Sequence, residues 1–168
     1  MKKERQTNTI MNFILDKNKF SVDNIHFSEI KHNIIIYGNF TKIFYSTPYF
    51  VLNNIFIDFE IIPTEFRQYT TTTKSVNKYI VYFDLCNENV EILQKIIDIE
   101  KYILDYYFIY RNICKTPEYI LKNQIMNKNF KFYKETRNLS SSNEKFYLKI
   151  SGVWENNQKF GITYKIMN

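Results

Sequence analysis

The sequence FYLKISGVWENNQKFGITYKIMN, residues 146–168, alternates between apolar and polar side chains on both sides of a polar turn at 155–158. Successive side chains of a β-strand point to opposite faces of its sheet, so the alternation predicts a two-stranded hairpin. The expected apolar face carries Phe146, Leu148, Ile150, Phe160, Ile162, Tyr164 and Ile166. The expected polar face carries Tyr147, Lys149, Ser151, Lys159, Thr163 and Lys165, and the only tryptophan, Trp154, falls where the first strand enters the turn.

A sheet face that carries lysines and aromatic rings suits a single-stranded nucleic acid, because ammonium groups neutralise phosphates and flat rings stack on bases. Lys149 and Lys165 are expected to be cross-strand neighbours on this face, where like charges repel unless an anion lies between them. They are therefore the first candidate phosphate contacts. Lys128, Lys131 and Lys134 form a second candidate basic cluster. The alternative for all these lysines is an ordinary solvated surface.

Aromatic residues are the candidates for stacking on bases, each stack being worth about 1–3 kcal/mol. The candidates are Trp154, Tyr147, Tyr133, Tyr45 and Tyr37. The alternative is that these rings belong to the core or to half-buried strand positions.

The composition is that of one globular domain with a basic surface. A chain of 168 residues is long enough for one core and short for two. Alanine is absent and asparagine, isoleucine, lysine, tyrosine and phenylalanine abound, which indicates an AT-rich gene and accounts for part of the lysine and aromatic content. The net charge of +6 still favours a polyanionic partner. Lysine supplies most of it and lacks the planar fork that reads guanine, so sequence-independent contact is expected.

Several function classes find no support in the sequence. Two cysteines and two histidines show no metal-ligand spacing, so no metal and no cofactor are expected, and the thiols are expected to stay reduced. No apolar run reaches the length of a membrane span, since residues 103–113 are interrupted by Asp105 and Arg111, so no membrane span is expected. The first residues lack the features of a secretory signal. A cytoplasmic location follows as the expectation, in a host cytoplasm if the gene is viral or plasmid-borne.

Along the chain, residues 1–9 are expected to form a flexible arm, with Lys2, Lys3 and Arg5, and residues 10–168 a single domain. Residues 12–24 are ambiguous between a short strand and a docked segment. Strands are expected within 34–50, with a turn or bulge at Gly38-Asn39 and a strand edge or break at Pro48, and also at 55–62, 79–84 and 130–134. Polar loops are expected at 64–77 and 139–143.

The hydrophobic period changes from two to about 3.6 at residues 90–110, which predicts a long amphipathic helix with Asn87 or Asn89 as its N-cap. A short helix is expected at 118–126. The element order predicts a mainly β (α+β) fold with one long helix before the last strands. An OB-type five-stranded Greek-key barrel has this plan, and a generic α+β sandwich fits as well.

Residues 148–154, LKISGVW, and 159–162, KFGI, resemble the closing hairpin of OB-fold single-stranded DNA-binding proteins of the phage, cytoplasmic DNA virus and linear plasmid type. The resemblance covers about 20 residues and its motifs are degenerate. It implies that Lys149, Trp154, Lys159 and Lys165 lie on or beside the DNA-facing surface. Many such proteins carry a flexible acidic tail, and residues 164–168 show no acidic run.

These observations predict a non-enzymatic, sequence-tolerant single-stranded DNA-binding protein of replication, with RNA as an alternative ligand and replication proteins as further partners. The oligomeric state is left open.

A protein–protein interaction module of a viral, replication or transcription complex is the first alternative. A small Mg²⁺-dependent nuclease built on Asp58, Glu60 and Asp84 is the second, although the lysine that such sites place after the second acid is missing. No nucleophile motif or Gly-rich phosphate loop is present.

Overall fold

The computed structural model describes residues 14–16, 18–33, 37–70, 77–134 and 144–168. The expected arm at 1–9 and the expected serine-rich loop at 139–143 lie outside these residues. The strands are β1 (Ile25–Asn33), β2 (Gly38–Ser46), β3 (Val51–Leu52), β4 (Ile55–Ile61), β5 (Pro63–Thr70), β6 (Asn77–Phe83), β7 (Thr116–Pro117), β8 (Asn129–Lys134), β9 (Glu144–Glu155) and β10 (Lys159–Met167). The helices are α1 (Asn87–Arg111), α2 (Ile120–Met126) and the short 3-10 helix η1 (Val22–Asn24).

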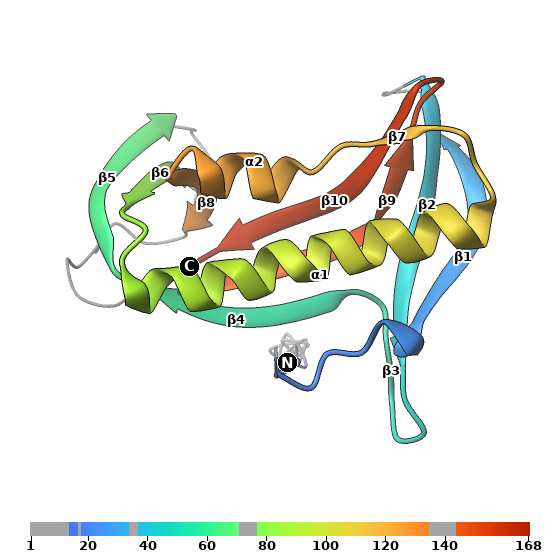
Figure 1. Cartoon of the computed structure of the whole chain (residues 1–168), viewed down its shortest axis with the longest axis horizontal. Helices are drawn as coiled ribbons and strands as arrows, with labels where there is room; N and C mark the ends of the chain where they lie inside the picture. Colours follow the sequence, from blue (N-terminus) through green and yellow to red (C-terminus); the bar gives the residue numbers. More distant parts are fainter. Residues whose placement is uncertain (1–13, 17, 34–36, 71–76, 135–143) are drawn as a thin grey trace, which may run out of the picture.

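The ten strands of the described residues belong to one mixed sheet, and β9 pairs with three of the others (Figure 1). One edge of β9 pairs with residues 160–167 of β10, while its other edge pairs first with β4 and then with β2. Thr163 pairs with Gly152 and Tyr164 with Ile150, so Ser151 is an extra residue in β9. Such a bulge bends and twists a strand, and it falls where β9 changes partner from β4 to β2.

The expected hairpin is confirmed as β9 and β10, whereas the sheet differs from a five-stranded barrel. Its main path runs β1-β2-β9-β10-β8-β6-β5, and within the described residues the two end strands do not pair with each other. The difference arises because residues 64–70, part of the polar loop that we expected at 64–77, belong to β5, and residues 25–33 add β1. Gly38, expected in a turn, begins β2. The coarser expectation, a mainly β fold with a long helix before the last strands, is confirmed.

The helices cover one face of the sheet, and the core lies between (Figure 1). α1 spans the expected helix and buries one stripe of its surface, as its apolar period requires. The apolar members of that stripe are Leu93, Ile96, Ile99, Ile103, Leu104 and Tyr107. The helix ends at Arg111. Its C-cap, Asn112, has a left-handed backbone (φ 48°) that turns the chain, and the Asn112 N–H donates a hydrogen bond to the carbonyl of Ile109.

The start of α1 differs from the expected side-chain cap. Cys86 is the N-cap and makes no side-chain cap bond, and Asn87 already lies within the helix. Asn89 is buried instead, and its amide donates to the carbonyls of Ile62 (3.0 Å) and Asp84 (2.9 Å). Its oxygen accepts from the N–H of Ile62 at 2.8 Å. Asn89 therefore fastens the first turn of α1 to the β4–β5 connection.

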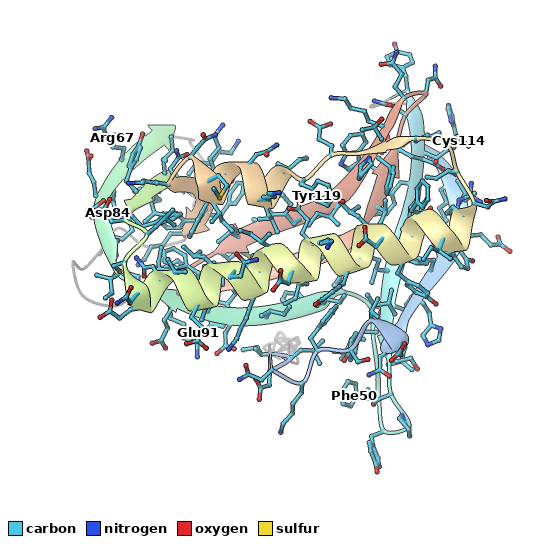
Figure 2. All side chains as sticks on the ribbon, in the orientation of Figure 1. Phe50, Arg67, Asp84, Glu91, Cys114 and Tyr119 are labelled. Atoms are coloured by element: carbon cyan, nitrogen blue, oxygen red, sulfur yellow. The ribbon has the colours of Figure 1, made fainter. Side chains whose placement is uncertain are left out.

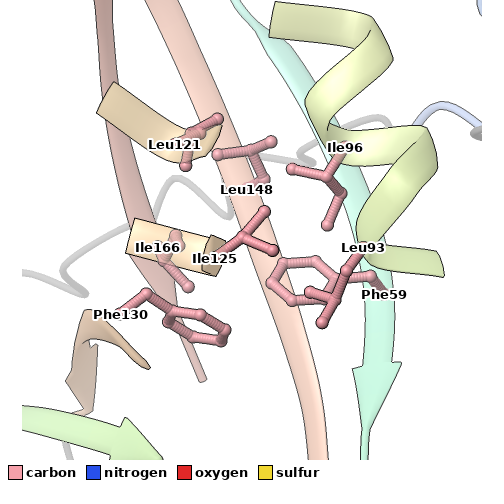
Figure 3. Close-up of a pocket in the computed structure, with 8 residues that line it drawn as sticks. All are labelled: Phe59, Leu93, Ile96, Leu121, Ile125, Phe130, Leu148 and Ile166. Carbon is pink, nitrogen blue, oxygen red and sulfur yellow. The ribbon is translucent and has the colours of Figure 1, made fainter. Parts of the chain in front are cut away.

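The core between the helices and the sheet contains a void of about 10 Å³ (Figure 3). Its lining is wholly apolar: Phe59, Leu93, Ile96, Leu121, Ile125, Phe130, Leu148 and Ile166. A void of this size holds at most one water-sized sphere, and an apolar one offers water no hydrogen bonds. The void is thus a packing feature of the core, and a ligand site must be sought on the surface.

Candidate nucleic-acid interface

The face of the sheet opposite the helices carries the polar side chains of the terminal hairpin. Lys149 pairs directly with Lys165 across β9 and β10, as we expected from the alternation. Their neighbours Leu148 and Ile166 point into the core and are almost fully buried, whereas both lysines are half-buried. Side chains alternate along a strand, so with Leu148 and Ile166 buried against the helices both lysines lie on the opposite, exposed face of the sheet.

Lys149 and Lys165 belong to a row of side chains that crosses five adjacent strands, and we call this set the transverse row. Its members, in order from β6 to β4, are Lys78, Tyr133, Lys165, Lys149 and Phe56. Lys78 pairs with Tyr133 across β6 and β8, and Lys149 pairs with Phe56 across β9 and β4. Neighbouring strands lie about 4.8 Å apart, so the row extends about 20 Å.

Each lysine of the transverse row lies over an aromatic ring of the same row. The Lys165 Nζ is 4.3 Å and the Lys78 Nζ 5.7 Å from the centre of the Tyr133 ring, while the Lys149 Nζ is 5.5 Å from that of Phe56. Cation–π contacts of this kind are worth about 0.5–1 kcal/mol at exposed sites. Within the described part of the chain, none of the three lysines forms an ion pair. Their charge is thus not neutralised by a described carboxylate.

A pocket of about 280 Å³ opens beside the β6–β8 end of the transverse row. Among the described residues, Lys78, Lys131, Phe132 and Tyr133 line it. Lys131, one of the lysines singled out in the sequence, pairs with Ile80 across β6 and β8 and is exposed. The pocket is therefore bounded by lysines from two neighbouring strands.

Tyr147 lies next to the transverse row, opposite Asp58 on β4. Lys145 lies 5.8 Å from the ring of Tyr147, and its Nζ is 2.8 Å from a carboxylate oxygen of Asp58. The hydrogen bond to Asp58 and the attraction of its charge raise the pKa of Lys145. Because Asp58 and Glu60 both occupy this part of β4, the outer face is cationic along the row and acidic beyond it.

Trp154 lies on the same face but farther along β9, past the bulge at Ser151. It pairs with Gly161 on one side and with Phe40 on the other. A Cβ atom added to Gly161 would lie only 2.9 Å from the Trp154 Cζ2, so the indole packs against that glycine. The half-buried Trp154 is separated from the transverse row by the length of about five residues, some 16 Å.

The other sequence-derived candidates lie outside the transverse row. Lys159, at the start of β10, is exposed and lies 3.8 Å from a carboxylate oxygen of Glu118. Lys134 ends β8 two residues after the buried Phe132, so it does not share the side of the strand that carries Lys131. Lys128 pairs with Asp84 at 3.5 Å. The predicted cluster of residues 128, 131 and 134 is thus divided between different surfaces.

Two of the candidate stacking tyrosines are placed very differently. Tyr45 is 2% exposed, and its hydroxyl accepts from the N–H of Ser21 and the amide of Asn24. It is a core residue, because its position on β2 has the parity of the buried strand residues. Tyr37 is 84% exposed and precedes β2 with a φ of 46°.

Lys78 and Phe56 are the members of the transverse row that sequence analysis missed. Phe56 lies in a strand that we did predict, on the side opposite its buried isoleucines. Lys78 precedes the expected strand at 79–84 by one residue. The alternation of residues 78–83 could have placed Lys78 on the polar side of β6, but only the strand order brings it beside Tyr133.

The acidic residues considered for a nuclease are distributed over different elements. Asp58 and Glu60 lie on β4. Asp84, labelled in Figure 2, follows β6, and its carboxylate lies 3.5 Å from the Lys128 Nζ. Over residues 14–168, leaving out the undescribed stretches, no group of three or more histidine, cysteine, aspartate or glutamate side chains could hold a metal ion.

In the same residues, no helix is long and apolar enough to cross a membrane.

The two cysteines are free thiols at opposite ends of α1. Cys114 is labelled in Figure 2, beyond the C-terminal end of that helix. Cys86 precedes the helix and Cys114 follows it. A helix of 25 residues is about 37 Å long, whereas bonded cysteines have Cα atoms less than about 7 Å apart. A disulfide between them within one chain is therefore excluded.

Two buried carboxylates hold the helices to the sheet and to each other. Glu155, at the end of β9, is 1% exposed and lies 2.8 Å from the Lys115 Nζ and 3.6 Å from the Arg111 guanidinium. Burial alone would raise its pKa, but the Lys115 ammonium and the other donors outweigh burial and lower it. Glu100, on α1, accepts from the N–H groups of Leu121 and Lys122, and burial raises its pKa.

Comparison with protein-family models, with curated proteins and with solved structures finds no significant match to this chain. The assignment of a function therefore rests on the outer face of the sheet.

Proposed function

We propose that this protein binds single-stranded DNA without strong sequence preference and acts in DNA replication. The observation that carries the proposal is the direct pairing of Lys149 with Lys165 on the exposed face, between Tyr133 and Phe56. Like charges on paired residues of a sheet repel, and here the Lys165 ammonium lies over Tyr133 on one side of the pair and the Lys149 ammonium over Phe56 on the other. An anion bound along this face would offset their remaining repulsion. A phosphate of a nucleic acid backbone is such an anion.

The proposed mechanism is electrostatic, with stacking as its second component. Each lysine that neutralises a phosphate releases condensed counterions, which favours binding at low salt. The aromatic rings of the transverse row then offer surfaces on which splayed bases stack, at about 1–3 kcal/mol per base. Because lysine contacts phosphate rather than base edges, all sequences should bind similarly.

The hairpin's resemblance to OB-fold single-stranded DNA-binding proteins supports the same function. The open sheet changes where the ligand would lie: across five strands of an exposed face instead of in the groove of a closed barrel. Tyr147 lies beside the transverse row, while Trp154 and Lys159 lie farther along the hairpin. A longer strand of DNA would reach these two residues, so they belong to the proposal as outer contacts.

The proposal is tested by fluorescence anisotropy with a labelled oligothymidylate. Replacing Lys165 with glutamine should weaken binding about fivefold at roughly 0.1 M salt, the effect of one phosphate contact on a single strand. Lys101→Gln is the matched control, because Lys101 is exposed on α1 at the other face of the sheet. Equal affinity of the two variants, both with intact circular dichroism, would contradict binding at the transverse row.

A protein–protein interaction module remains the second candidate, and one observation favours it. The outer side of α1 exposes Tyr102 (52%), Ile109 (74%) and Tyr110 (54%), which are large apolar side chains. Exposed apolar patches commonly mark interfaces. Tyr102→Ser with Ile109→Ser should leave oligothymidylate binding unchanged if the sheet face is the functional one. No oligothymidylate binding by the wild-type protein, even at low salt, would instead favour the interaction module.

A further inference from the structure

Tyr133 is the ring of the transverse row that two lysines approach. Lys78 reaches it from β6 on one side, and Lys165 reaches it from β10 on the other. Their Nζ atoms lie 5.7 Å and 4.3 Å from the same ring centre, so two positive charges meet at one residue. Phe56, the other ring of the row, has one such lysine, Lys149.

The surface is also hollow beside Tyr133. The pocket of about 280 Å³ is lined by Lys78, Lys131, Phe132 and Tyr133 among the described residues. A charged group that enters it approaches lysines on two neighbouring strands at once. Field lines concentrate in such a hollow more than over a flat face, which increases the attraction for an anion.

The two lysine charges beside Tyr133 suit a phosphomonoester better than a phosphodiester. An internal phosphodiester of a nucleic acid carries one negative charge. A phosphomonoester carries about 1.5–2 negative charges at pH 7, because its second pKa is about 6, and it presents three acceptor oxygens. Two lysines at one ring therefore favour the monoester over the diester.

We propose that the pocket lined by Lys78, Lys131 and Tyr133, with Lys165 on the other side of Tyr133, binds a terminal phosphomonoester of a single-stranded nucleic acid. This inference rests on the proposed function, since the remainder of the strand lies along the transverse row towards Lys149. The protein would thus bind a phosphorylated strand end in preference to the interior of the strand.

The test compares three labelled oligothymidylates of equal length: one with a 5′-phosphate, one with a 3′-phosphate and one with neither. A phosphorylated form should bind about fivefold tighter than the unphosphorylated one at roughly 0.1 M salt, as one further neutralised charge requires. The two phosphorylated probes identify which end is bound. The preference should shrink as the pH falls below about 6, where the monoester loses its second charge.

Variants assign the preference to the pocket. Lys78→Gln should abolish the difference between the three probes. Because Lys78 belongs to the transverse row, the variant should also weaken the unphosphorylated probe, but by no more than one lost phosphate contact, about fivefold at roughly 0.1 M salt. Lys101→Gln, on the helical side, should leave the preference intact. Equal binding of all three probes by the wild-type protein overturns the inference and leaves the proposed function standing. No binding of any probe overturns both.

Discussion

At the scale of the residue, Glu155 is a buried carboxylate that two cations neutralise. It is 1% exposed at the end of β9, with Lys115 at 2.8 Å and Arg111 at 3.6 Å. Both cations lie at or just beyond the C-terminus of α1, so the interaction holds that end of the helix to the tip of the hairpin. The Asn39 amide of β2 donates to the same carboxylate at 3.4 Å.

Glu155→Gln should therefore destabilise the protein. The substitution leaves two partly buried cations without their anion, at a cost of about 2–3 kcal/mol, below the value for fully buried pairs because both cations keep some exposure. The free energy of unfolding at pH 7, from urea titration, measures it. Glu65→Gln, at an exposed pair with Arg67, is the control and should change the unfolding midpoint far less.

The same variant has a defined pH dependence. The pKa of Glu155 lies below its ordinary value of 4.5 in the folded state, so the unfolded chain binds its proton first as the pH falls. The stabilisation is complete above pH 4.5 and is lost as the pH falls through the lowered pKa. The difference between wild type and Glu155→Gln should accordingly shrink on going from pH 7 to about pH 3. A constant difference would show that the charge of Glu155 is not its cause.

At the scale of the element, α2 depends on a side chain of another helix. The residue at its N-cap position, Tyr119, makes no side-chain cap bond. Glu100 of α1 supplies the acceptors instead, at 2.9 Å from the N–H of Leu121 and 2.9 Å from that of Lys122. A carboxylate at this place satisfies donors that a helix cannot pair internally, and its negative charge complements the helix dipole.

Glu100→Ala should loosen α2 from the rest of the molecule. It leaves two N–H groups without an acceptor near the core, which costs about 2–4 kcal/mol in total. Hydrogen exchange should show faster exchange of the amides of Leu121 and Lys122, while β9 and β10 keep their protection relative to global unfolding. Glu91→Ala, on the exposed side of α1, is the control. Unchanged exchange at both amides would show that the docking of α2 does not depend on Glu100.

The elements differ in how far sequence predicts them. The hairpin and α1 were predicted because their patterns are long and local: alternation over 146–166 and a helical period over 90–110. β5 was missed because it is an edge strand whose residues Glu65, Arg67 and Gln68 are exposed. An edge strand pairs on one side only and tolerates polar residues, so its sequence is similar to that of a loop.

The residues of the candidate site also differ in how far the sequence predicts their positions. The pairing of Lys149 with Lys165 depends on the register of one hairpin, and the alternation was enough to predict it. The positions of Lys78 and Phe56 depend on β6 lying beside β8 and β4 beside β9, which join residues far apart in the chain. We predicted that Lys131 and Lys134 belong to one cluster because they are close in sequence. They lie an odd number of residues apart on β8, so their side chains point to opposite faces of the sheet.

At the scale of the whole molecule, the question is whether binding depends on the total charge or on its arrangement. The net charge of +6 reflects lysines spread over the helical side as well as the sheet face. If the AT-rich composition alone set this charge, any two lysines would contribute equally to the attraction of DNA. If the transverse row is the binding site, two of its lysines should matter far more than two others.

Two double variants that lower the net charge by the same amount separate these possibilities. Lys149→Gln with Lys165→Gln removes the paired lysines of the transverse row, and Lys101→Gln with Lys122→Gln removes two exposed lysines of the helices. The logarithm of the association constant falls linearly with the logarithm of salt concentration, with a slope of about 0.7 per phosphate neutralised on a single strand. The row variant should lose about 1.4 from this slope and the helix variant almost nothing. Titrations of an oligothymidylate between about 50 and 200 mM salt measure both slopes. Equal slopes for the two variants would mean that the charge acts as a diffuse field and that the paired lysines have no special part in binding.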